Sequence, residues 1–131
     1  MDTPTLSQQR NADLRDAYQR IIKTESVNSR YLKRSSIISL LMEMPAPRFY
    51  LTSEWARTIF RGWRRKSRHI RKDKIPKELV DDLRDTYTRV KEQYPGAPEV
   101  TLWQIVVEQP AKSFYISAKR MEEIIFNYSG R

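Results

Sequence analysis

The sequence predicts an all-α protein built from two tandem three-helix modules in a pseudo-twofold arrangement, with room for one short pairing of extended segments. Two internal matches carry this prediction. Residues 13–21 (DLRDAYQRI) return as residues 82–90 (DLRDTYTRV), and residues 43–52 (EMPAPRFYLT) return as residues 108–117 (EQPAKSFYIS). The offsets are 69 and 65 residues, so one deletion of four residues aligns both matches. The sequence therefore contains one module used twice.

The matches also suggest where the modules begin and end. We assign residues 1–60 to the first module and residues 76–131 to the second, with residues 61–75 between them as a basic helical extension or linker. A module of roughly fifty residues is marginal alone because it buries too little surface. Solenoid arrays need three or more repeats. Two copies are therefore expected to close on each other as an internal pseudo-dimer within one compact domain.

The first segment of each module has helical periodicity. Apolar side chains recur three, four and seven positions apart around Leu14 and Tyr18, and again around Leu83 and Tyr87. Pro76 suits the first helical position of the second copy, because the N–H that proline lacks would be unpaired there. Each module is therefore predicted to begin with an amphipathic helix.

A second, shorter helix is predicted at about residues 36–44 and again at about residues 101–109. Ser36 and Thr101 occupy equivalent positions and suit an N-cap. A proline follows the helix in both copies, and proline ends a helix because it has no N–H to donate and disfavours a helical residue before it. The second helices should therefore be short and alike.

Aromatic residues follow each of these prolines. Residues 49–51 and 114–116 are rich in aromatic and branched side chains, which favours an extended segment. Such rings can stack on bases, but both copies keep them beside a proline turn, so we interpret them as core. Thr52 and Ser117 then suit the N-cap of a third helix.

The net charge of +9 is concentrated in one stretch of the chain. Residues 1–60 carry a net charge of +3, residues 61–75 carry +7, and residues 76–131 carry −1. So basic a stretch beside a near-neutral remainder favours contact with a polyanion. We therefore expect nucleic acid as the partner, with DNA favoured over RNA.

The third helix of the first copy is expected to continue into this stretch. At 100° per residue its arginines fall within an arc of about 80°, opposite an apolar stripe that includes Trp55, Ile59 and Trp63. The planar guanidinium fork of arginine pairs with phosphate oxygens at two points. The candidate nucleic-acid-binding residues are Arg57, Arg61, Arg64, Arg65, Arg68, Arg71, Lys72 and Lys74.

Two other interpretations of the basic helix stay open. As a packed linker, its arginines would pair with Asp81, Asp82 and Asp85, and the protein would be a protein–protein adaptor or a self-assembling homo-oligomer. As a basic amphipathic helix, it would lie on an anionic membrane with Trp55 and Trp63 as anchors. The order of helices is similar to that of helix-turn-helix proteins, but about seven residues separate the second and third helices where that motif uses three or four.

Nothing in the sequence indicates enzyme chemistry. The single histidine, His69, lies in the basic stretch, where neighbouring positive charge disfavours its protonated form. The chain has no cysteine, no metal-ligand spacing and no glycine-rich phosphate loop. We expect a non-enzymatic protein without cofactor or metal. Residues 1–11 lack the apolar core of a signal peptide, and no apolar run reaches the roughly 20 residues of a membrane span, so we expect a cytoplasmic location.

Overall fold

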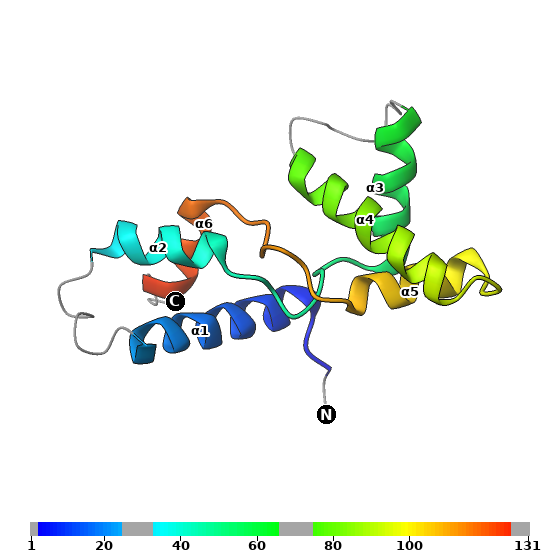
Figure 1. Ribbon diagram of the computed structural model, residues 1–131. Coiled ribbons are helices and arrows are strands. Elements are labelled where there is room, and N and C mark those ends of the chain that lie inside the picture. Colours follow the sequence, from blue (N-terminus) through cyan, green and yellow to red (C-terminus); the bar gives the residue numbers. More distant parts are fainter. Residues whose placement is uncertain (1–2, 25–32, 66–74, 127–131) are drawn as a thin grey trace. The chain divides into compact units, whose positions relative to one another are not determined.

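The computed structural model describes residues 3–24, 33–65 and 75–126, and of residues 63–65 it describes the backbone (Figure 1). These ranges contain six helices and no sheet, so the all-α prediction is confirmed for them. The extended segments add no sheet to the described chain. The helices are α1 (Leu6–Thr24), α2 (Arg34–Glu43), α3 (Ser53–Arg65), α4 (Lys77–Gln93), α5 (Glu99–Glu108) and α6 (Ala118–Phe126).

Hydroxyl side chains cap three of the helices. The backbone N–H of Trp55 donates to Thr52 Oγ1 at 3.1 Å, and the backbone N–H of Arg120 donates to Ser117 Oγ at 3.1 Å. Both predicted N-caps of the third helices are confirmed. At α1, the backbone N–H of Gln8 donates to the Thr5 hydroxyl and the backbone N–H of Thr5 donates to Gln8 Oε1. This reciprocal capping box starts α1 earlier than the apolar periodicity alone indicates.

Prolines occupy the N-cap positions of α4 and α5. Pro76 and Pro98 have φ of −62° and −64° with extended ψ, and neither makes a side-chain cap hydrogen bond. The fixed φ of proline suits such a residue, so Pro76 stands one position before its helix instead of within it. Both second helices begin two residues earlier than predicted. The assignment of Ser36 and Thr101 as N-caps was therefore wrong.

The helices form two compact units that cross the sequence repeat. Unit 1 contains Met1–Ala46 and Lys112–Arg131, and unit 2 contains Pro47–Ala111. Helix α6 packs against α1 and α2, whereas α3 packs against α4 and α5. Each unit therefore joins the first two helices of one copy to the third helix of the other. The tandem modules, with boundaries at residues 1–60, 61–75 and 76–131, are not confirmed.

The connectors before the third helices explain this exchange of partners. The nine residues 44–52 and the nine residues 109–117 are not helical, and each stretch has a proline at its second position. An extended chain spans at most about 3.3–3.6 Å per residue, so either connector can carry a helix about 30 Å away. A short turn at each connector would instead keep the third helix beside its own module, as the sequence repeat predicts.

Burial repeats between the two copies. Leu14 and Leu83 are fully buried, and Phe49 and Phe114 are 2% and 3% exposed. Both phenylalanines lie in the non-helical connectors. The duplication seen in the sequence therefore extends to the burial of these matched side chains, and the core assignment of the two rings is confirmed.

Each unit contains an aromatic contact between the first helix of one copy and the third helix of the other, which is α1 with α6 in unit 1 and α4 with α3 in unit 2. In unit 1, Tyr18 meets Phe126 edge to face, with ring centroids 5.7 Å apart. In unit 2, Phe60 lies 5.5 Å from Tyr87, which stacks on Trp103 at 4.7 Å. Such pairs stabilise beyond the area that they bury. The repeated tyrosine thus contacts the other copy's third helix in both units.

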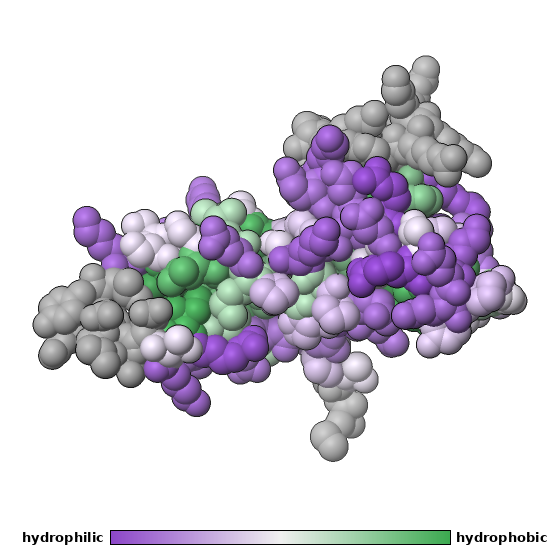
Figure 2. Space-filling view, in the orientation of Figure 1, coloured by the Kyte–Doolittle hydropathy of each residue, from purple (hydrophilic) through white to green (hydrophobic). Residues whose placement is uncertain are grey.

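The surface differs in character between the units on the face that Figure 2 shows. Hydrophilic residues cover most of unit 2 there, whereas hydrophobic residues reach the surface over unit 1. In α2 of unit 1, Leu40 and Met42 are 39% and 43% exposed. Unit 2 also exposes large apolar side chains, those of Trp55, Tyr94 and Val100.

Candidate nucleic-acid interface

Helix α3 carries the described part of the predicted basic surface. Ala56 and Ile59 are buried on the side that faces α4 and α5, and Arg57 and Arg61 lie at the margin of that side with partial exposure. Trp55 is 43% exposed, so its assignment to the buried stripe was wrong. Helix α3 therefore buries Ala56 and Ile59 but leaves Trp55, which lies near its N-terminus, exposed.

Arg57 and Arg61 share a single carboxylate, that of Glu99. Arg57 Nε lies 3.4 Å from Oε1, and Arg61 Nη2 donates to Oε2 at 2.6 Å. Glu99 is the first residue of α5, where the helix dipole favours an anion. Two guanidiniums held by one carboxylate keep a net positive charge, so Glu99 fixes them side by side without neutralising the pair.

The packed-linker interpretation assigned the acidic partners of this helix to α4. Within α4, Asp81 and Asp85 pair with Arg84 at 3.3 and 3.8 Å. Asp82 is 2% exposed and accepts a hydrogen bond from the Thr86 hydroxyl at 3.4 Å. The partner observed for the two α3 arginines belongs to α5 instead, so α3 does use an acid of the second copy, but one outside the predicted set.

The other predicted contacts lie at or beyond the end of α3. Arg64 and Arg65 belong to its last turn, whose backbone the structure describes. Position 64 falls seven residues after Arg57 and three after Arg61, hence on the same helix face. The remaining predicted residues lie outside the described ranges: Arg68, Arg71, Lys72 and Lys74.

The equivalent helix of the second copy, α6, has a different charge. Its two basic residues, Lys119 and Arg120, are matched by Glu122 and Glu123. Arg120 Nη1 lies 3.7 Å from Glu123 within the same helix. By contrast, α3 has four arginines and one acidic residue. The duplicated helices therefore differ where a polyanion would bind.

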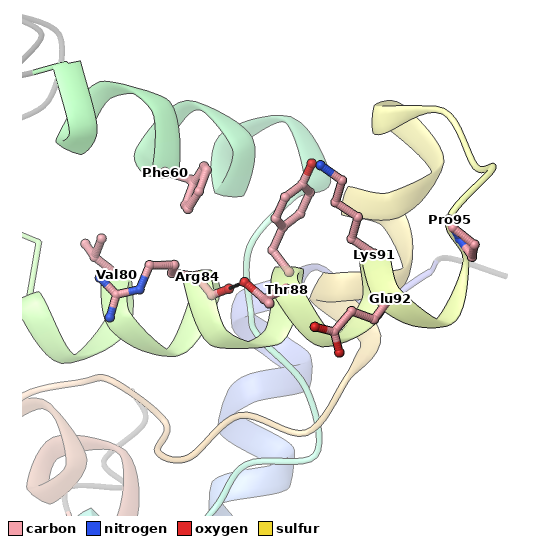
Figure 3. A pocket seen from close by; sticks show the side chains of 8 residues that line it. Phe60, Val80, Arg84, Thr88, Lys91, Glu92 and Pro95 are labelled. Atoms are coloured by element: carbon pink, nitrogen blue, oxygen red, sulfur yellow. Dashed lines mark hydrogen bonds between the residues drawn. The ribbon is translucent and has the colours of Figure 1, made fainter.

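Unit 2 also has an open pocket of about 790 Å³ between α3 and α4 (Figure 3). Phe60 points into it from α3, opposite Val80 and Tyr87 of α4, and the charged side chains of Lys91 and Glu92 lie at its edge. Its volume is in the range of small-molecule sites. Sequence reasoning missed this pocket because it placed α3 and α4 in different modules.

The described ranges offer no metal site and no membrane span. No group of three or more His, Cys, Asp or Glu side chains there could hold a metal ion, and none of the helices described is long and apolar enough to cross a membrane. No known protein family matches the chain, and neither a curated protein nor a solved structure matches it.

Proposed function

We propose that this protein binds nucleic acid, without catalysing a reaction, through arginine contacts to phosphate from α3 and the basic stretch that follows it. The observation that carries the proposal is the net charge of +7 within residues 61–75, which begin in the last part of α3, in a chain of net charge +9. Neutralising phosphates releases counterions, which supplies binding energy without base recognition. The proposed setting is the cytoplasm, with DNA favoured over RNA.

The described part of α3 suits a row of phosphates. Positions 57, 61 and 64 share one helix face and span about 10 Å at 1.5 Å per residue. One strand of a duplex places a phosphate about every 3.4 Å along the axis, so this row matches about three phosphates. Two of these guanidiniums, those of Arg57 and Arg61, lie close together because both contact Glu99.

The test is the salt dependence of binding to a fluorescently labelled duplex, measured by anisotropy between 50 and 200 mM salt, a range over which such binding falls steeply. One triple variant removes Arg61, Arg64 and Arg68, and a matched triple variant removes Lys112, Lys119 and Arg120, all by alanine. The first should lose most binding, and its salt slope should fall by about 0.9 per lost contact. Equal losses in both variants, or no binding by wild type at low salt, would refute the proposal.

A second candidate function is that of a protein–protein adaptor, and the pocket of unit 2 favours it. The pocket has an apolar wall, and Arg84 at its edge is matched by acidic neighbours on α4. Such a site suits an apolar or aromatic side chain of a partner protein. Titration with N-acetyl-tryptophanamide should shift the backbone amide resonances of Thr88 and Lys91. Thr88 is exposed at the pocket, so Thr88→Trp should fill the pocket and suppress those shifts. If the resonances of the wild-type protein do not shift on titration, this candidate function is refuted.

A further inference from the structure

The connector between α5 and α6 contains a strained backbone position. Tyr115 has φ of 56°, and it is the only non-glycine residue with positive φ in the described ranges. Side chains with a Cβ are disfavoured there because the Cβ approaches the following carbonyl oxygen. The backbone N–H of Tyr115 donates to Ser113 Oγ at 3.1 Å, which holds the bend locally. Tyr50, at the equivalent position of the first connector, has no such strain.

The helix that this connector delivers depends on unit 1 for its stability. Helix α6 has nine residues, well below the length at which an isolated helix is stable in water. It buries Met121, Ile124 and Ile125 in unit 1, where it packs on α1 and α2. These contacts require a copy of α6 on the surface of α1 and α2, but they do not require that the copy belong to the same chain.

We propose that α6 is exchanged between two copies of this chain, so that α6 (Ala118–Phe126) of one protomer packs on α1 and α2 of the other while the connector up to Tyr115 stays with its own chain. The contacts of α6 are the same in the closed and the exchanged forms, so they cancel in the comparison. What differs is the connector, because a segment that runs to a second protomer no longer has to bend at Tyr115. Strained hinges of this kind promote exchange of an identical element between protomers.

The asymmetry between the connectors identifies which helix is exchanged. Both third helices already pack away from their own sequence module, on equivalent connectors of nine residues. Strain is present in the second connector only. Helix α6 also closes unit 1 from a segment separate in sequence from α1 and α2, whereas unit 2 is one continuous segment. Exchange therefore involves α6, and unit 2 stays within its own chain.

The test uses the natural absence of cysteine from the chain. Tyr18 and Phe126 touch in unit 1, so full-length Tyr18→Cys and Phe126→Cys chains are unfolded together, refolded as a mixture and oxidised. Exchange predicts a disulfide-linked heterodimer on a non-reducing gel, well above the yield from Thr88→Cys mixed with Phe126→Cys. The double variant Tyr18→Cys/Phe126→Cys, refolded at high dilution, shows whether the two positions can form a disulfide at all.

A pair of glycine variants tests the cause. Glycine adopts positive φ without penalty, so Tyr115→Gly should lower the yield of the heterodimer by about tenfold for each hinge relieved. Tyr50→Gly removes an equally half-buried side chain from the other connector and should leave the yield unchanged. The proposal is overturned if the heterodimer is no more abundant than in the Thr88→Cys and Phe126→Cys mixture, provided that the double variant forms its disulfide within one chain. If the double variant does not close, the same set is run with cysteines at Ala17 and Ile125. Equal effects of the two glycine variants would overturn the role of strain.

Discussion

Glu99→Gln is the most direct perturbation of the candidate interface. The glutamine keeps the size and shape of the side chain, while the single carboxylate shared by Arg57 and Arg61 loses its charge. If these arginines bind phosphate, Glu99 competes with the ligand for them and also repels it. The substitution should therefore weaken the fold slightly and strengthen binding to nucleic acid, which are opposite effects from one change.

The size of both effects follows from the geometry. The three side chains are 35%, 43% and 36% exposed, and ion pairs at such positions contribute about 0–1 kcal/mol each. The free energy of unfolding should thus fall by about 1 kcal/mol. A phosphate across a guanidinium lies about 7 Å from the carboxylate, where repulsion in a water-like medium is about 0.6 kcal/mol. In the variant, the two arginines no longer have to give up their ion pairs with Glu99 when they bind phosphate. This effect adds to the loss of repulsion, so affinity for nucleic acid should rise about three- to tenfold.

The assay compares Glu99→Gln with Glu122→Gln, which makes the same change in net charge on the exposed surface of α6. Anisotropy titrations with a labelled duplex at low and moderate salt give the affinities, and the advantage of Glu99→Gln should shrink as salt screens the repulsion. Thermal unfolding without ligand measures the stability term. Affinity unchanged or reduced relative to Glu122→Gln would show that the α3 arginines do not contact phosphate.

Three further predictions concern the fold. Phe49→Ala and Phe114→Ala should each lower the free energy of unfolding by about 3–5 kcal/mol, because both rings are almost fully buried; an unchanged melting temperature would contradict this. Thr52→Ala and Ser117→Ala each remove a capping acceptor and should cost about 1 kcal/mol in urea unfolding. Trp103→Phe should cost less than Phe49→Ala, since it keeps an aromatic ring and removes an indole N–H that has no hydrogen-bond acceptor in the described ranges; a larger loss would point to an acceptor.

The helices could be predicted from the sequence because their signals are local. Periodicity around Leu14 and Leu83 located the first helices, and hydroxyl residues at 52 and 117 marked the start of the third ones. The partner of each third helix is not a local property. Duplication makes the sequences of α1–α2 and α4–α5 similar, so residue patterns alone do not tell which pair of helices each third helix covers.

The candidate site was predictable only in part for the same reason. Charge counting identified α3 and the stretch after it, and Arg57 and Arg61 do lie together on one side of α3. Their common partner, Glu99, belongs to α5, which the sequence repeat had placed in the other module. The pocket beside Phe60 is built from two helices separated in the same way. Both features depend on which helices pack together, and the sequence repeat had predicted the wrong packing partners for α3.

The split of unit 1 into two separate segments has a consequence for a chain that is still being synthesised. Helices α1 and α2 emerge first, but the helix that covers them, α6, follows the whole of unit 2 in the chain. Unit 2 is one continuous segment, so it can fold before α6 is available to pack on α1 and α2. The usual order, in which the N-terminal part folds first, is thereby reversed. Until α6 has emerged, Leu14, Ala17 and Ile21 remain uncovered by it, so a nascent chain at that stage exposes apolar surface that the finished fold buries.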